Sequence, residues 1–308
     1  MMLRSRLTIL ALFMLGLSFL AAVGHAAPRV IATIAPVHSL VAMVMEGTGA
    51  PDLLLPAKAS PHHFALKPSH ARALVEADVV FLVAEDLERF LIRPLATLAK
   101  DALVVRLAEV EKLTRLAMRN GHDDDDHGHD TDEDEHGTLD PHMWLDPANA
   151  RLWLDKIAQT LAEVDPANSG RYRQNSMVAK EQLTTLEYDI GKLLDPIRNQ
   201  RYILFHDGFQ YFENRFDFPA TATMALSDAR PPGARRIAEL RQLMIAGSIS
   251  CVFSEPQLPA KIVETLIADT GIKHGELDPI GMTLTPGPSL YPALIRNLAI
   301  SLRTCFGD

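Results

Sequence analysis

The sequence predicts an α/β protein with two lobes, each a mostly parallel sheet flanked by helices, joined by one long rigid connecting helix. Three observations lead to this prediction. Short apolar runs alternate with longer helix-like segments. The run Asp78–Ala84 (DVVFLVA) is continuously apolar, as expected for a parallel strand covered on both faces. The segment Arg171–Ile197 has apolar residues at helical spacing for about seven turns.

The first half of the chain follows the alternating pattern up to an acidic tract. Strands are expected at Arg29–Ala35, Asp52–Pro56, Asp78–Ala84 and Ala102–Leu107, and helices at Val37–Glu46, Pro68–Glu76 and Glu85–Lys100. A further helix is expected from Pro147 to about Glu163, and a polar break then separates it from the long helix.

The second half repeats the architecture without repeating the sequence. Strands are expected at Tyr202–Phe205, at Ser248–Phe253 and in a segment leading to Asp278, and helices at Arg235–Ala246, Ala260–Gly271 and Tyr291–Cys305. The long helix between the halves is interpreted as the connector. The alternative is an ordinary surface helix of a single domain.

The first 26 residues have the pattern of a secretory signal. Arg4 and Arg6 precede an apolar run from Leu7 to about Val23, and small residues then flank a cleavage site after Ala26. The alternative is a retained membrane anchor, but the run is short for a spanning helix. We expect a signal peptide at 1–26, an N-terminal lobe at 27–165, the connecting helix at 166–200 and a C-terminal lobe at 201–308.

An acidic, histidine-rich tract lies at 121–137. It carries nine carboxylates and no basic residue, so it cannot be buried in a packed domain. Its four histidines are His122, His127, His129 and His136. Imidazole and carboxylate are ligands for zinc, so accessory metal contact is favoured over a plain solubilising spacer. The nine acids equal the net charge of −9, and nothing basic remains to suggest nucleic acid binding.

The two cysteines of the chain are Cys251, in an apolar strand-like run, and Cys305, at the end of the last expected helix. Export to an oxidising compartment makes a disulfide between them plausible. The alternative is two buried free thiols. They lack the C-x-x-C spacing of a shared zinc site.

Seven histidines lie outside the tract and the signal: His38, His62, His63, His70, His142, His206 and His274. Of these, His62, His142 and His206 fall in loops or strand ends where a parallel sheet exposes its ligand-binding edge. Three converging imidazoles would form a zinc site. Asp278, also at a strand end, is the candidate for a fourth, oxygen ligand, with water as the alternative. The histidines His38, His70 and His274 are interpreted as structural.

The segments SPHHFALKPS, DPHMWLDP, ILFHDGFQYF, CVFSEPQ and GELDPIG occur in this order. With them the chain resembles the cluster A-I solute-binding proteins, the zinc-binding periplasmic components of bacterial ABC importers, over essentially the whole mature chain. The resemblance implies a periplasmic monomer that delivers Zn²⁺ to an ABC permease and, through it, to an ATPase subunit at the inner membrane. The Cys251–Cys305 pair matches a disulfide of some zinc-binding members.

The resemblance also implies roles for individual residues. His62, His142 and His206 match the three ligand histidines, and Asp278 matches a carboxylate ligand of manganese-binding relatives. His63 is a weaker alternative donor beside His62. Manganese-binding relatives have Glu at the position of His206, and imidazole suits zinc better than manganese, so this set of ligands favours zinc.

Several polar residues are candidates to orient the ligands. Asp146 and Asp207 are close in sequence to His142 and His206 and are expected to accept their second N–H. Asp146 is equally well explained as a helix N-cap before Pro147. Glu255 is a further polar candidate near the cleft.

The predicted function is metal capture and delivery without catalysis, with the acidic tract as a flexible collector beside the site. Three alternatives remain: a binding protein for manganese or another divalent metal with the same fold, a metal buffer without a transporter, and a secreted zinc hydrolase. The hydrolase alternative lacks an H-E-x-x-H helix, and Glu255 is its only obvious general base.

Overall fold

The structure is a computed structural model that describes residues 27–56, 58–62, 64–119, 139–225, 232–247, 249–258 and 260–307. The expected signal peptide at 1–26, the four tract histidines and His63 lie outside these residues. Within them, no helix is both long enough and apolar enough to cross a membrane.

The N-terminal sheet has four parallel strands in the order β2-β1-β3-β4. The strands are β1 (Val30–Ala32), β2 (Asp52–Leu53), β3 (Val79–Leu82) and β4 (Leu103–Arg106). Every residue of β3 is buried, as its continuous apolar run predicted. All four strands lie inside the predicted ranges, and each is shorter than expected.

The C-terminal sheet repeats this arrangement in the order β6-β5-β7-β8, again all parallel. Its strands are β5 (Tyr202–His206), β6 (Ala222–Ala225), β7 (Cys251–Ser254) and β8 (Lys273–Glu276). The sequence did not predict β6 or the preceding helix α7 (Gln210–Phe216). Both are short, and β6 has neither a continuous apolar run nor a clear alternation. The two-sheet α/β fold is confirmed.

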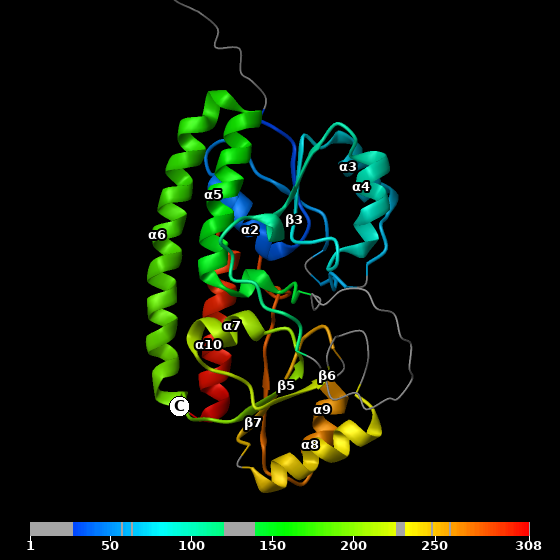
Figure 1. Ribbon diagram of the computed structural model, residues 1–308, viewed down its shortest axis with the longest axis vertical. Helices are drawn as coiled ribbons and strands as arrows, with labels where there is room; N and C mark the ends of the chain where they lie inside the picture. Colours follow the sequence, from blue (N-terminus) through cyan, green and yellow to red (C-terminus); the bar gives the residue numbers. More distant parts are fainter. Residues whose placement is uncertain are drawn as a thin grey trace, which may run out of the picture.

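Helices cover both sheets (Figure 1). They are α2 (Ala35–Val44), α3 (Pro68–Glu76), α4 (Ile92–Leu98), α5 (Pro147–Val164), α6 (Ser169–Leu194), α7, α8 (Ala234–Ala246), α9 (Ala260–Ile267) and α10 (Leu290–Phe306). The helix predicted from Glu85 to Lys100 was wrong in its first half. A 3₁₀ turn at Arg89–Leu91 precedes α4. Because proline is tolerated only in the first turn of a helix, Pro94 prevents α4 from beginning much earlier.

The predicted long helix is confirmed as α6, which has 26 residues. At 1.5 Å per residue its length is about 39 Å, enough to pass both sheets. Figure 1 shows it along one side of the molecule, next to α5 in the upper half and to α10 in the lower half. Its buried face includes Tyr172, Leu183 and Leu194.

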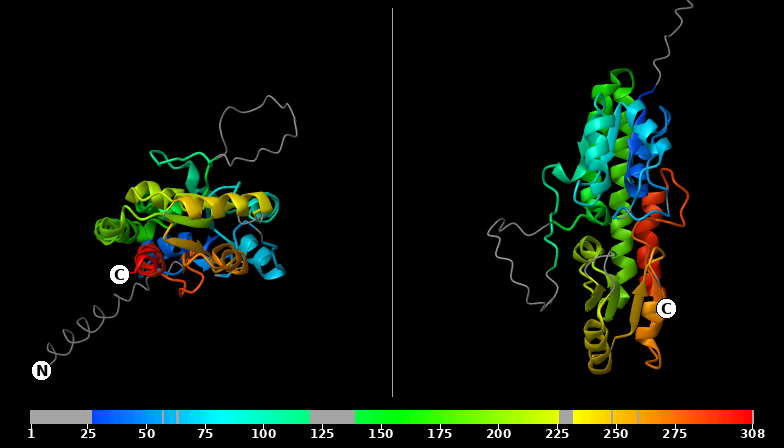
Figure 2. Two further views of the ribbon diagram at one scale, coloured as in Figure 1. Left: turned by 90° about the horizontal axis from the view of Figure 1, so that it is seen from below. Right: turned by 90° about the vertical axis from the view of Figure 1, so that its right-hand side faces the viewer.

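The last helix, α10, makes a second connection that the sequence did not reveal. It follows the C-terminal sheet in the chain, yet it lies beside α6 and reaches the N-terminal half (Figure 2). There the Tyr291 backbone N–H donates to Ser39 Oγ on α2 at 2.9 Å, and Ser39 Oγ donates to the Pro288 carbonyl at 3.2 Å. The two halves are therefore held together by α10 as well as by α6.

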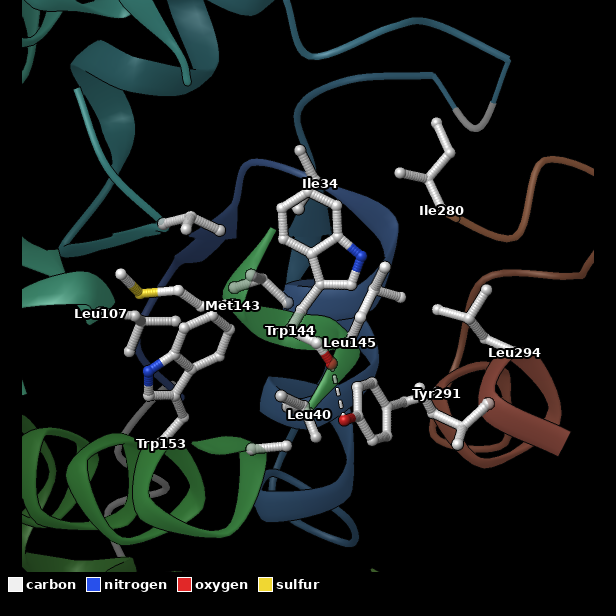
Figure 3. Close-up of a cluster of buried hydrophobic side chains, with 14 of the residues drawn as sticks. Ile34, Leu40, Leu107, Met143, Trp144, Leu145, Trp153, Ile280, Tyr291 and Leu294 are labelled. Atoms are coloured by element: carbon white, nitrogen blue, oxygen red, sulfur yellow. Dashed lines mark hydrogen bonds between the residues drawn. The ribbon is translucent and has the colours of Figure 1, made fainter. Parts of the chain in front are cut away.

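The junction of the halves is packed around Trp144 (Figure 3). The Tyr291 hydroxyl donates to the Trp144 carbonyl at 2.7 Å, and Trp144 Nε1 donates to the Pro279 carbonyl at 2.7 Å. All three residues are buried, and one apolar core includes β3 and β7 residues such as Phe81 and Phe253. This shared core stabilises one arrangement of the halves.

The disulfide between Cys251 and Cys305 is present. Cys251 is the first residue of β7, and Cys305 lies in the last turn of α10. The bridge ties the end of the chain to the centre of the C-terminal sheet, as predicted for an exported protein.

A buried carboxyl group, that of Glu88, closes the turn after β3. Its Oε2 accepts from the backbone N–H groups of Val83 at 2.9 Å and Ala84 at 3.1 Å. Burial raises the pKa of Glu88 from 4.5 to about 7, and hydrogen bonds from Thr33 and these two amides only partly oppose the rise. Near neutral pH, this group titrates inside the N-terminal half.

We expect Glu88→Gln to change the pH dependence of stability. The folded protein keeps this proton up to about pH 7, whereas the unfolded chain releases it near 4.5. The stability from this group is therefore complete below about pH 4.5 and is lost as pH rises through 7, by an amount on the order of 3 kcal/mol. Denaturant unfolding of metal-free protein measures this at pH 5 and pH 8. Relative to the wild type, the free energy of unfolding of Glu88→Gln should be higher at pH 8 than at pH 5. The exposed control Glu111→Gln should show no such gain, and a gap independent of pH would refute the assignment.

Candidate metal centre

Three imidazoles from separate parts of the chain meet at one point. His62 lies in the loop after β2, His142 immediately precedes a 3₁₀ turn at Met143–Leu145, and His206 is the last residue of β5. One nitrogen of each ring lies within 4.8 Å of the other two. His142 and His206 are buried, and His62 is half-buried. The fold therefore brings together the three histidines that the sequence singled out.

The nitrogens are spaced as a metal ion requires. His142 Nε2 lies 3.4 Å from His62 Nε2 and 3.5 Å from His206 Nε2. Two nitrogens bound tetrahedrally to zinc, each about 2.0–2.1 Å from the ion, would stand about 3.3–3.4 Å apart. The two measured separations are therefore close to those of a tetrahedral zinc site.

Two buried carboxylates fix the orientation of two of these rings. His142 Nδ1 is 2.7 Å from Asp140 Oδ1, which also accepts from the His142 backbone N–H at 2.9 Å. His206 Nδ1 is hydrogen-bonded to Glu255 Oε1, and Glu255 Oε2 accepts from Gln257 Nε2 at 2.7 Å. A carboxylate selects the tautomer with the proton on Nδ1. Both Nε2 atoms are thereby left with a lone pair for an ion.

The charge on Asp140 is maintained by the histidine it orients. Burial tends to raise the pKa of Asp140, but the nearby His142 and its hydrogen bonds, with a smaller one from Gln210, bring the pKa below its usual value. Asp140 is therefore ionised and can accept the Nδ1–H of His142.

The expectation that Asp207 orients a ligand was wrong, and of the two interpretations of Asp146 the helix N-cap is confirmed. Asp146 caps α5 by accepting from the Ala148 N–H at 2.8 Å, and it pairs with Arg215 at 2.6 Å. Asp207 pairs with Arg119. Each lies beside a ligand in sequence, but its side chain is engaged elsewhere. The acceptors are Asp140, two residues before His142 in the D-P-H segment, which the sequence analysis missed, and Glu255, which it named as a candidate and which directly follows β7.

Asp278 stands apart from the group formed by the three histidines. Its Oδ1 accepts from the backbone N–H groups of Ile280 at 3.1 Å and Gly281 at 2.8 Å, which shapes the turn after β8. The group of mutually close donor atoms in the described residues contains the three histidines and not Asp278.

The remaining described histidines have local structural contacts. His38 Nε2 contacts the Pro51 carbonyl at 3.1 Å, His70 Nδ1 accepts from the Lys67 N–H at 3.1 Å in the cap of α3, and His274 Nε2 lies 2.8 Å from Ser254 Oγ. The structural role expected for these three agrees with the contacts.

Two parallel α/β sheets, bridged by long helices and with three imidazoles between them, define the class of metal-binding solute-binding proteins. Solved structures share this fold. A zinc-bound ZnuA with residues 138–173 deleted aligns with a TM-score of 0.76 over 92% of this chain and 99% of its own, at 21% identity. A nickel-bound solute-binding protein from P. aeruginosa, FpvC, aligns with a TM-score of 0.75 over 91% and 96%, at 20% identity.

Sequence comparison identifies the family within this class. The family of the periplasmic zinc-uptake complex component A matches residues 30–305, and the chain belongs to it. The high-affinity zinc uptake system protein ZnuA of Brucella abortus is 38% identical, covering 90% of this chain and 91% of that protein. The protein of the same name from Paracoccus denitrificans is 32% identical, covering 91% and 92%.

The backbone at Gly208 leaves no room for a side chain. A Cβ built on this residue would overlap Nε2 and Cε1 of His206. We therefore expect Gly208→Ala to displace the ring and to weaken zinc binding by at least about tenfold, because ligand geometry sets metal affinity. Competition with a zinc chelator measures this. Gly233→Ala is the matched control, because a Cβ there meets nothing within 4 Å. Equal affinity in the two variants would contradict the geometry.

Proposed function

We propose that this protein captures Zn²⁺ at His62, His142 and His206 in the periplasm and delivers it to an ABC-type permease. The observation that carries the proposal is the convergence of three Nε2 atoms at zinc-like separations, two of them fixed by buried carboxylates. The zinc-uptake relatives and the family match support it.

The ligand chemistry supports zinc over manganese. Three imidazoles form a nitrogen-rich site, whereas manganese prefers oxygen donors. Such a site would also bind copper or nickel more tightly than manganese, so selectivity in the cell depends on metal supply and on the transporter. A water molecule or Asp278 completes the shell. Asp278 is not in the group of donor atoms that lie within 4.8 Å of one another, which makes water the simpler fourth ligand.

The contacts of Glu255 favour binding over hydrolysis. The family is a solute-binding family for zinc uptake and not a known class of enzyme. In a zinc hydrolase the general base must reach the water on the open side of the metal. Here both oxygens of Glu255 are engaged, one by His206 Nδ1 on the far side of the ring and the other by Gln257. The candidate base is thus occupied in positioning a ligand.

Delivery is proposed to use local loop movement and not wide separation of the lobes. Helices α6 and α10 both join the halves, and Trp144, Tyr291 and Pro279 link the His142 turn to the C-terminal half through buried hydrogen bonds. His62, by contrast, is half-buried in a loop. The loop of His62 is therefore the part of the centre best placed to open towards a permease.

The periplasmic location and the remaining assignments follow the sequence. The signal peptide is proposed to end near Ala26, and the mature chain is proposed to act as a monomer that docks on the permease of an importer with an ATPase subunit. The domain limits are proposed as 27–165, 166–200 and 201–308, and the division of the strands into two sheets with α6 between them in the chain supports this proposal. His122, His127, His129 and His136 are proposed to collect zinc weakly near the centre.

Zinc titration of the mature protein tests the assignment. We expect one tight site that survives deletion of 121–137 and loses at least about a hundredfold in affinity in His62→Ala, His142→Ala or His206→Ala, because a tetrahedral site with a missing ligand is incomplete. His274→Ala, a structural histidine, is the matched control and should bind as the wild type does. Loss of the tight site on deletion of the tract, with the three histidine variants unaffected, would place the site in the tract and overturn the proposal.

A further inference from the structure

One guanidinium group, that of Arg119, lies between the two halves of the chain next to the metal centre. Its N–H groups donate to both oxygens of Asp207, with Nε at 2.9 and 2.8 Å, and to Glu213 at 2.9 and 3.1 Å. The Asp207 and Glu213 side chains are 5% and 4% exposed, whereas that of Arg119 is 36% exposed. Among the ion pairs of the described residues, Arg119 is the basic partner of both carboxylates.

Removing this guanidinium would be costly. Two buried carboxylates lose the one cationic partner that they have within the described part of the chain. A buried charge without a partner destabilises its surroundings far more than the pair stabilises them. In a variant without the guanidinium, water can reach these carboxylate oxygens only if residue 119 moves away from Asp207 and from Glu213 on α7. A surface ion pair would not have this consequence, because its charges are already hydrated.

Arg119 belongs to a short two-stranded stem formed by residues 115–119 and 139–140. Ala117 and Leu139 form an antiparallel bridge, and the Asp140 N–H donates to the Leu116 carbonyl at 2.9 Å. The stem therefore ends at Asp140, the residue that orients His142.

The stem is also attached to α7 by side chains. The Tyr211 hydroxyl accepts from the Leu116 N–H at 3.0 Å and donates to the Asp140 carbonyl at 3.0 Å. Gln210 Nε2 donates to the Ala117 carbonyl at 2.9 Å and to Asp140 Oδ2 at 3.1 Å. In these bonds neither partner is charged, except that Gln210 donates to the Asp140 carboxylate. Arg119 instead joins a cation to two carboxylates, so it supplies the strongest attachment of the stem.

The stem leads to one of the three histidines, His142, and the strand β5 carries another, His206. Asp140 holds His142, and Asp207, held by Arg119, directly follows His206. Nε2 of His142 and Nε2 of His206 are 3.5 Å apart. When the half-buried His62 withdraws, zinc is still held by His142 and His206, and separation of these two histidines is opposed by the contacts of Arg119.

We propose that Arg119 is a positioning residue for zinc exchange, which pins the stem to the His206–Asp207 turn and thereby sets the rate at which zinc leaves the three-histidine centre. The proposal rests on zinc capture at that centre. Arg119 does not contact the metal, so its effect appears in dissociation more than in association, as is usual when a buried charged pair is broken.

The test is the rate of zinc loss from mature protein, loaded with one equivalent of zinc, to an excess of a chromophoric chelator. Arg119→Gln should accelerate loss by at least about tenfold. Arg119→Lys should give an intermediate rate, because lysine keeps the charge but not the fork that reaches two carboxylates. The matched control is Arg115→Gln. It removes the same charge from the same stem, where Arg115 is exposed and its hydrogen bonds to other described residues go to the carbonyls of Ala108 and Val110.

Amide hydrogen exchange of the metal-free proteins separates the possible outcomes. Arg119→Gln should accelerate exchange at Leu116 and Asp140, and Arg115→Gln should not. If Arg119→Gln loses zinc at the same rate as Arg115→Gln, the proposal is overturned. This holds even if amide hydrogen exchange is faster in Arg119→Gln, because Arg119 would then stabilise the stem without affecting zinc loss. If the wild-type protein itself retains no zinc, the proposed function fails, and that result is distinct because it is seen before any variant is compared.

Discussion

Three imidazole lone pairs directed at one point are the constraint on which the rest of the structure depends. His142 Nε2 stands 3.4 Å from His62 Nε2 and 3.5 Å from His206 Nε2, and unprotonated nitrogens at these separations repel one another until a cation lies between them. The protein must therefore hold them there in advance. Asp140 and Glu255 do so by accepting Nδ1–H from His142 and His206, which fixes both tautomer and ring direction. Gly208 contributes by leaving room for the His206 ring.

Rigid support is needed because the ligands come from distant parts of the chain. His62 follows the N-terminal sheet, His206 ends a strand of the C-terminal sheet, and His142 lies in the turn between them. A change of a few tenths of an ångström between the halves would alter the nitrogen separations. The helices α6 and α10, the buried hydrogen bonds of Trp144 and the shared apolar core all oppose such a change. The disulfide from Cys251 to Cys305 holds the end of α10 to β7.

Local features of the sequence were sufficient to predict much of the fold and part of the metal centre. Continuous apolar runs predicted parallel strands, and helical spacing predicted α5, α6 and α10. The positions of His62, His142 and His206 at strand ends or loops predicted the three histidines that the fold brings together. Contacts across the fold could not be predicted in the same way. Glu255 reaches His206 because β5 and β7 are neighbours, so sequence proximity pointed wrongly to Asp207. Likewise, the contact between Ser39 and Tyr291 joins residues at opposite ends of the chain. Asp140 had a usable signal, an acid two residues before His142.

The most direct test of the account is a crystal structure of the mature protein with one equivalent of zinc, measured on both sides of the zinc absorption edge. The account predicts one strong anomalous peak about 2.0–2.1 Å from Nε2 of His62, His142 and His206, with an oxygen as the fourth ligand. The Nδ1 contacts to Asp140 and Glu255 should remain intact. A peak bonded to Nδ1 of any of these rings, or lying away from the three histidines, would contradict it.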